Sequence, residues 1–197
     1  MPTLTKRLNQ IRIKISTSAK QANRTAGDIT LLAVSKNELS DSPITWHFIG
    51  PIQSNKTKPI AENFDWVHSI CSIKIATRLN NQRPKELPPI NALVQINIDN
   101  EASKSGLALE ELPKFLAQSR DLTQLNFRGL MCLPLNTDDP TKQRESFAKL
   151  RELRDGLKSD YPDLILLSMG MSKDFNSAIQ EGSNIVRIGT ALFGPRP

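Results

Sequence analysis

Short β-branched runs that are apolar on both faces alternate with helical patterns along the 197-residue chain. Runs of this kind, separated by helices, are typical of a parallel sheet that is covered on both sides. Helices are predicted, for example, over residues 109–122 and 141–159. Seven strands are predicted, over residues 29–35, 47–49, 66–69, 92–97, 127–131, 164–167 and 185–188.

This order of elements favours a TIM-type (β/α) barrel over a dinucleotide-binding fold, because no G-x-G-x-x-G follows the first strand. The strand count, however, is one short of the usual eight. Only nine residues lie between Lys36 and Trp46, whereas a parallel crossover normally needs a dozen or more. Either the second βα unit is missing here, or a strand lies within "NELSDSPIT", which its Asp, Ser and Pro residues disfavour.

The length suits one domain, so residues 1–197 are predicted to form a single domain. The composition, with 38% hydrophobic and 23% charged residues, is that of a globular protein, and no apolar run approaches the roughly 20 residues of a membrane helix. Cys71 and Cys132 form no C-x-x-C motif, and His47 and His68 have no metal-ligand spacing. These features predict a reduced, cytoplasmic and metal-free protein.

The basic residues concentrate at the N-terminus. Residues 1–27 hold six of them and no acidic residue, which accounts for the whole formal net charge of +6. The balanced remainder disfavours nucleic acid as a partner. Leucine and isoleucine residues from Leu4 to Ile15 follow helical spacing and predict an amphipathic helix of the domain with a basic outer face. A transit peptide would have the same composition, but no small-residue cleavage site follows.

Lys36 is the first candidate for chemistry. Leu32, Val34 and Lys36 share one face of the first predicted strand, and Lys36 stands at its C-terminal end, where barrel enzymes place their active sites. Apolar walls disfavour the charged form of a lysine, so its amine becomes available to form a Schiff base with a carbonyl compound. On position alone, a lysine that reaches solvent is the simpler interpretation.

Small residues follow the last two predicted strands. Ser168, Gly170 and Ser172 form a turn before a helix, whose N-terminus would present N–H groups and hydroxyls to an anion. Gly189 and Thr190 end the last strand, where the backbone can approach a ligand closely. For either loop alone, an ordinary cap or turn is the better explanation. Barrel phosphate sites often use these two loops, and barrel closure would bring them beside the lysine, so together they predict a pocket for a phosphorylated aldehyde.

Arg187 lies in the last predicted strand, next to this pocket. A guanidinium donates a hydrogen bond to a pyridine nitrogen rather than protonating it, which disfavours strong electron-sink chemistry. The alternative is an arginine in a salt bridge at a strand end.

Six motifs cover nearly the whole chain: "AVSK" (33–36), "WHFIGPIQSNKTKPI" (46–60), "INIDNEASKSG" (96–106), "RGLM" (128–131), "LSMGMSKDF" (167–175) and "VRIGTALFG" (186–194). On these motifs the chain resembles the pyridoxal-phosphate homeostasis proteins, which share the barrel of the alanine racemase N-terminal domain. The stretch 46–60 is the most specific of the six.

The resemblance implies that pyridoxal 5′-phosphate (PLP) is bound as a Schiff base on Lys36, with Arg187 facing the pyridine nitrogen. It implies that the phosphate lies among Ser168, Gly170, Ser172, Gly189 and Thr190. It also implies a protein without established catalysis that buffers PLP or delivers it to PLP-dependent apoenzymes. We further expect the protein to be a monomer. The remaining motif residues have two interpretations: His47 is a packed strand residue or lines the barrel mouth, and Gln53, Asn55 and Lys56 cap the next helix or line the mouth.

Family members carry a further strand and helix between the lysine and the Trp-His-Phe motif, and this sequence lacks them. The loss exposes two strand edges and predicts a stability lower than that of a complete relative. The gap could be closed by direct strand pairing, stay open or be filled by another subunit. Two functional alternatives follow. One is a racemase-like PLP enzyme, and the other is a remnant that no longer binds PLP and serves as a scaffold or as a nucleic-acid-associated protein through its basic N-terminal helix.

Overall fold

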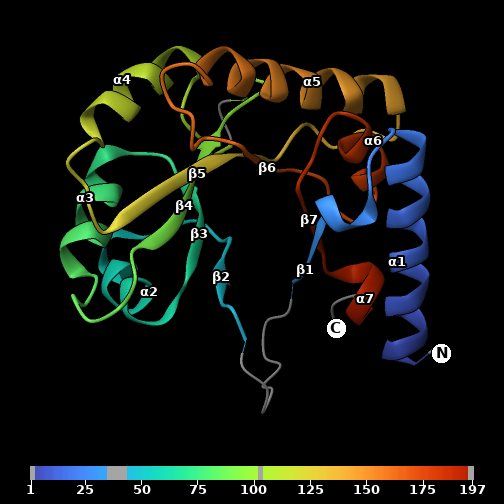
Figure 1. Ribbon diagram of the computed structural model, residues 1–197, viewed down its shortest axis with the longest axis horizontal. Coiled ribbons are helices and arrows are strands. Elements are labelled where there is room, and N and C mark those ends of the chain that lie inside the picture. The colour runs from blue at the N-terminus through green and yellow to red at the C-terminus, as the bar shows by residue number, and fades with distance from the viewer. Residues whose placement is uncertain (1–2, 35–43, 102–103, 195–197) are drawn as a thin grey trace. The chain divides into compact units, whose positions relative to one another are not determined.

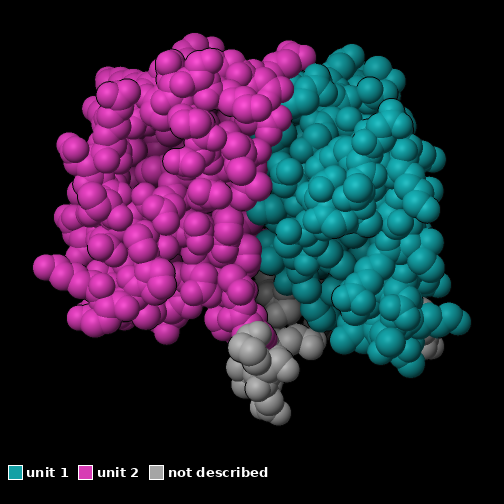
Figure 2. All heavy atoms as spheres, in the orientation of Figure 1, with its two compact units in different colours: residues 1–39, 134–151, 167–197 teal, residues 40–133, 152–166 magenta. Residues whose placement is uncertain are grey.

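The computed structural model describes residues 3–34, 44–101 and 104–194. Contacts along the chain group it into two compact units, which Figure 2 colours separately. Unit 1 comprises residues 1–39, 134–151 and 167–197, and unit 2 comprises residues 40–133 and 152–166. The assignment of residues 1–197 to one domain stays a prediction.

Seven strands occur in the described residues, and each overlaps a strand predicted from the sequence. The pairings within each unit are parallel, as expected for the α/β class. The strands are β1 (Thr30–Ala33), β2 (His47–Phe48), β3 (Trp66–Ile70), β4 (Ile90–Ile96), β5 (Leu125–Cys132), β6 (Leu166–Ser168) and β7 (Ile185–Ile188), labelled in Figure 1.

Unit 1 contains β1 and β6 on either side of β7. Its helices include α1 (Leu4–Gln21), α6 (Phe175–Gln180) and α7 (Thr190–Phe193), and α1 packs on the other two. Ile11 and Ile15 of α1 are buried in one apolar cluster with Phe175 and Leu192, so α1 is the amphipathic helix predicted from the sequence and belongs to the core of this unit. The 18-residue helix α5 (Pro140–Leu157) begins in unit 1 and ends in unit 2.

Unit 2 contains four strands in the order β5-β4-β3-β2, so β2 has a partner on one side only within this unit. Its helices are α2 (Thr57–Asn63), α3 (Ile73–Gln82) and α4 (Leu112–Gln118), and α2 follows the 3-10 turn η2 (Ser54–Lys56). The buried guanidinium of Arg83, which is 6% exposed, links the segment after α3 to α2. It donates to the carbonyls of Pro88, Ala61 and Phe64 at 2.8, 2.7 and 3.0 Å.

Among the described residues, none of the helices combines the length and the apolar character needed to span a bilayer. The same residues contain no group of three or more His, Cys, Asp or Glu side chains placed to hold a metal ion.

Candidate functional site

The loops that follow β6 and β7 lie against each other. The Ala191 N–H donates to Ser172 Oγ at 3.3 Å, and the Arg187 N–H donates to the Gly170 carbonyl at 2.9 Å. Because β6 and β7 are parallel neighbours, their C-terminal ends share one edge of the sheet. The structure therefore brings together the two loops that the sequence analysis selected.

Arg187 and Ser168 form a buried polar pair beneath these loops. Arg187 is 4% exposed, and its Nη1 donates to the Ser168 carbonyl at 2.6 Å and to Ser168 Oγ at 2.8 Å. Ser168 is the last residue of β6 rather than part of the following turn, so its hydroxyl faces the guanidinium and not an open loop. The strand predicted over residues 164–167 therefore begins and ends later in the structure, at Leu166–Ser168, where Ser168 pairs with Ile185 of β7.

Gly170 occupies a position where only glycine fits. Its φ is +95°, and a Cβ there would lie 2.6 Å from the Ala178 Cβ and 3.0 Å from the Phe175 Cα. The loop after β6 therefore packs directly on α6.

The helix after this loop begins later than the sequence suggested. Ser172 is not its cap; α6 begins at Phe175, and Asp174 holds the cap position. Asp174 Oδ1 accepts the Met171 N–H at 2.6 Å, which stabilises the turn. Burial raises the pKa of the Asp174 carboxyl, although the Met171 N–H and the charge of Arg187 act in the opposite direction. Asp174 was not among the predicted site residues, although an aspartate just before an apolar helical run is itself a cap signal.

The loop after β7 supplies the other side of the site. Gly189 precedes α7, and a Cβ at this position would lie 3.4 Å from the Val34 carbonyl oxygen at the end of β1. Thr190 is exposed. Among the residues that the structure describes, the backbone N–H groups of Ser172 and Thr190 donate to no partner. Lys36 lies outside the described residues.

This donor set suits a phosphate. The two N–H groups without a partner and the Thr190 hydroxyl belong to this pair of loops, and such donors bind phosphate oxygens well. The steric demand at Gly170 keeps the backbone close to α6. The residues present therefore fit the phosphate end of the predicted cofactor.

The Trp-His-Phe motif forms a packed cluster in unit 2. The Nδ1 of His47 lies 2.9 Å from the Nε2 of His68, and the His47 ring stacks on Trp66 with centroids 5.2 Å apart. Burial lowers the pKa of His47 to about 4, while the charge of Asp65 acts weakly in the opposite direction. This geometry agrees with the interpretation of His47 as a packed strand residue.

Gln53 and Lys56 occupy cap positions of η2 and α2, but neither side chain makes a capping hydrogen bond. Both line a pocket instead. Asn55 lies exposed within η2.

Comparisons of the chain with known proteins agree on one family. The family described as "Alanine racemase, N-terminal domain" matches residues 19–197. The pyridoxal phosphate homeostasis protein of Escherichia coli K12 is 43% identical over 222 aligned positions, which cover 96% of this chain and 95% of that protein. The protein of the same name from Pseudomonas aeruginosa is 44% identical over 226 positions, which cover 100% of this chain and 97% of that protein.

Two solved structures are similar over almost their full length. PipY of Synechococcus elongatus, with PLP bound, has a TM-score of 0.82 and 29% identity, and the match covers 98% of this chain and 100% of PipY. A protein of unknown function from Bifidobacterium adolescentis has a TM-score of 0.88 and 26% identity, with 96% and 94% of the two chains covered.

The sequence alignments also bear on the short connection before β2. The alignment with the Pseudomonas protein spans 226 positions and this chain has 197 residues, so at least 29 positions of the relative have no counterpart here. A strand and a helix with their loops need about this many residues. The difference in length therefore agrees with the loss of one βα unit.

Proposed function

The chain belongs to the pyridoxal phosphate homeostasis proteins, a family with the alanine racemase N-terminal domain, and on this basis we propose that it binds PLP and serves to keep this cofactor available in the cell. The observation that carries the proposal is the meeting of the loops after β6 and β7 above the buried Arg187. The similarity to PipY, whose structure contains PLP, supports the same assignment.

The described residues suggest how each end of the cofactor is held. We assign the phosphate to the N–H groups and hydroxyls of Ser172 and Thr190, with Gly170 and Gly189 allowing the backbone to approach. Ser168 holds the Arg187 guanidinium in place, and we assign Arg187 to the pyridine nitrogen. A hydrogen bond from a group that stays protonated would orient the ring without making it a strong electron sink.

PLP supplies an aldehyde, which a lysine amine can hold as a Schiff base. We assign this role to Lys36, which follows Val34 of the β1 end by two residues in the sequence. Val34 itself lies beside the C-terminal end of β7, because its N–H donates to the carbonyl of Ile188, the last residue of that strand, at 2.9 Å. This contact supports the choice of Lys36 over lysines elsewhere in the chain.

We propose that the protein binds PLP without turnover. Asp174 is the only carboxyl group in the loops 168–174 and 187–194, and it is committed to the Met171 N–H. The relatives are named as homeostasis proteins, which supports the same proposal. A racemase assay with L- and D-alanine tests it: turnover that depends on Lys36 would favour the racemase-like alternative.

We place the protein in the cytoplasm as a monomer that passes PLP to apoenzymes. Neither Cys71 nor Cys132 forms a disulfide, as is usual for proteins of reducing compartments, and burial raises the pKa of the Cys71 thiol, which limits its reactivity. Sedimentation velocity at several protein concentrations tests the monomer, since a dimer at micromolar concentration contradicts it.

The absorbance of the purified protein after incubation with PLP and desalting tests cofactor binding. We expect a retained Schiff-base band in the wild type and in Lys58→Ala, which removes a lysine on the surface of α2, and no band in Lys36→Ala. Pyridoxal without the phosphate should be lost on desalting, because only the phosphate can use the loops after β6 and β7. A folded wild type that retains no PLP would overturn the proposal and support the remnant alternative.

A further inference from the structure

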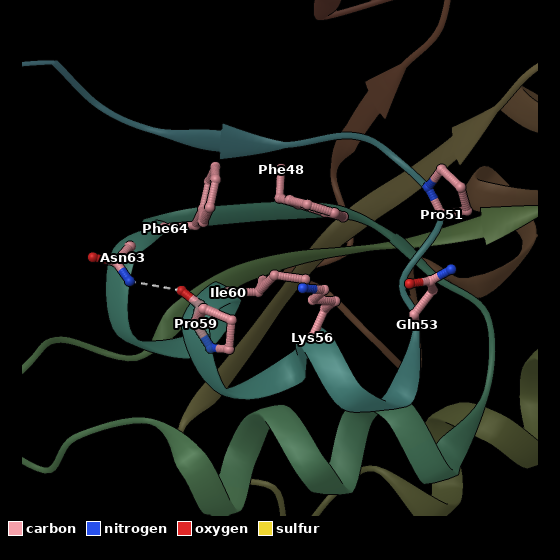
Figure 3. A pocket seen from close by; sticks show the side chains of 8 residues that line it. All are labelled: Phe48, Pro51, Gln53, Lys56, Pro59, Ile60, Asn63 and Phe64. Atoms are coloured by element: carbon pink, nitrogen blue, oxygen red, sulfur yellow. Dashed lines mark hydrogen bonds between the residues drawn. The ribbon is translucent and has the colours of Figure 1, made fainter. Parts of the chain in front are cut away.

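Unit 2 contains a cavity of its own. It has a volume of about 410 Å³ and lies between β2 and α2, as Figure 3 shows. This volume is at the small end of the range for ligand pockets, which start near 300 Å³. All of its lining residues belong to unit 2, whereas the described residues assigned to PLP belong to unit 1.

The walls of the pocket are aromatic and aliphatic. The rings of Phe48 and Phe64 meet edge to face, with centroids 5.3 Å apart and an angle of 86° between their planes. Ile60, which is 3% exposed, and the rings of Pro51 and Pro59 complete the apolar surface. A flat apolar ring fits such walls, because aromatic pairs gain from offset or edge-to-face contact.

One positive charge lies in this apolar lining. Lys56 is the only ionisable residue that lines the pocket, and among the described residues it forms no ion pair. Lys58, two residues further along, pairs with Glu62 at 3.8 Å. Asn63 is already occupied, since its Nδ2 donates to the Pro59 carbonyl at 2.8 Å.

Gln53 adds a neutral polar group to this charge. Figure 3 shows both side chains at the pocket, where Lys56 is the last residue of η2 and Gln53 is the residue just before this turn. The pocket therefore offers one ammonium group and one amide beside an apolar surface.

We propose that this pocket binds a small aromatic carboxylate, with the ring against Phe48 and Phe64 and the carboxylate on Lys56. A single negative charge matches the single ammonium group. A phosphate dianion would leave one charge unpaired beside apolar walls, which is unfavourable. The proposal therefore concerns a monoanionic acid with one ring and not a second PLP site.

The position of the pocket explains why this apolar surface is open. β2 is the last strand in the order of unit 2, and this chain lacks at least 29 residues that the Pseudomonas relative has. The short connection from Lys36 to Trp46 indicates that this loss lies immediately before β2. Removing a helix that covers a sheet exposes the apolar side chains beneath it, and exposed apolar surface of this kind commonly marks a binding site.

Titration with 3-phenylpropionate, followed by ligand-observed NMR and calorimetry, tests the proposal. The neutral 3-phenylpropanamide is the matched ligand without the charge. For an open pocket of this size we expect saturable binding in the millimolar range, with the acid bound about threefold to fivefold more tightly than the amide, as is usual for an exposed ion pair. Lys56→Gln should abolish this preference, whereas Lys58→Gln should keep it.

Two further variants separate this site from the PLP site and test the apolar wall. Lys36→Ala should bind the acid as the wild type does, so a failure of PLP binding leaves this prediction intact. Phe48→Leu should weaken the acid and the amide equally, because it removes ring contact and not charge. An unchanged preference for the acid in Lys56→Gln would overturn the proposal. So would a lack of saturable binding, including the case in which sedimentation shows that a second copy covers the pocket.

Discussion

Gly170 joins the candidate PLP site to the core of unit 1, so replacing it with alanine tests the loop geometry directly. The φ of +95° is unfavourable for any residue with a Cβ, which costs about 1–2 kcal/mol. The new Cβ would also lie 2.6 Å from the Ala178 Cβ, well inside normal contact, and overpacking of this kind costs about 1–3 kcal/mol. We therefore expect Gly170→Ala to lower the free energy of unfolding by about 2–5 kcal/mol.

Urea denaturation followed by circular dichroism measures this change. Gly156→Ala is the matched control, because Gly156 lies within α5 and a Cβ there would meet nothing within 4 Å. It should stabilise the protein by about 0.5–1 kcal/mol through helix propensity. A loss below about 1 kcal/mol in Gly170→Ala would refute the reasoning.

The double variant Gly170→Ala/Ala178→Gly separates the two contributions to this loss. Removing the Ala178 Cβ relieves the steric contact but not the backbone strain. The double variant should therefore be more stable than the sum of the single changes predicts, by about 1 kcal/mol or more. Strict additivity would contradict the steric contribution while leaving the φ contribution standing.

Three further predictions concern stability. Burial lowers the pKa of His47 to about 4 in the folded protein, against about 6.5 in an unfolded chain, so the stability contributed by the neutral ring is present above pH 6.5 and lost as the pH falls toward 4. For this partly exposed side chain we expect a loss of about 1–2 kcal/mol, and the free energy of unfolding measured between pH 4 and 7 should depend less on pH in His47→Gln than in the wild type. Arg83→Met leaves three carbonyls without their donor and should lower the free energy of unfolding, measured by urea denaturation, by about 2–4 kcal/mol. The control Lys85→Met, at an exposed residue, should lower it by under about 0.5 kcal/mol, and equal effects would contradict the role of Arg83. Phe147→Ala should lower the free energy of unfolding by about 3–5 kcal/mol and lower the melting temperature accordingly, because Phe147 is fully buried. Ile13→Ala, at a residue 66% exposed, should change the melting temperature little, so a similar shift in both variants would argue against the core assignment.

The strands and helices of this protein could be predicted because their signals are local. Each of the seven strands overlaps a short, mainly apolar run, and α1 follows from the spacing of Leu8, Ile11 and Ile15. The loops after β6 and β7 could be selected because the carboxyl ends of parallel neighbours share one edge of the sheet. The short connection before β2 was equally visible, since it is a matter of counting residues.

The errors lie where a distant part of the chain decides the local structure. Ser168 belongs to β6 because β7 continues to pair with it, and its hydroxyl faces a guanidinium 19 residues away. Ser172 resembles a helix cap in the sequence, but its hydroxyl accepts the Ala191 N–H from the other loop. Competition of this kind between a local and a distant partner cannot be resolved from the spacing of residues.

Periodicity, chain length and composition are properties of the linear sequence, and they were enough to predict the alternation of strands and helices, the short connection before β2 and the residue types around the candidate site. Tertiary structure alone decided that Gly170 must adopt a positive φ, that His47 pairs with His68, and that Lys56 lines an apolar pocket instead of capping a helix. Each of these features requires close contact between side chains or backbone atoms that the linear order keeps apart. Packing in three dimensions creates such contacts, and the hydrophobic pattern does not encode them residue by residue.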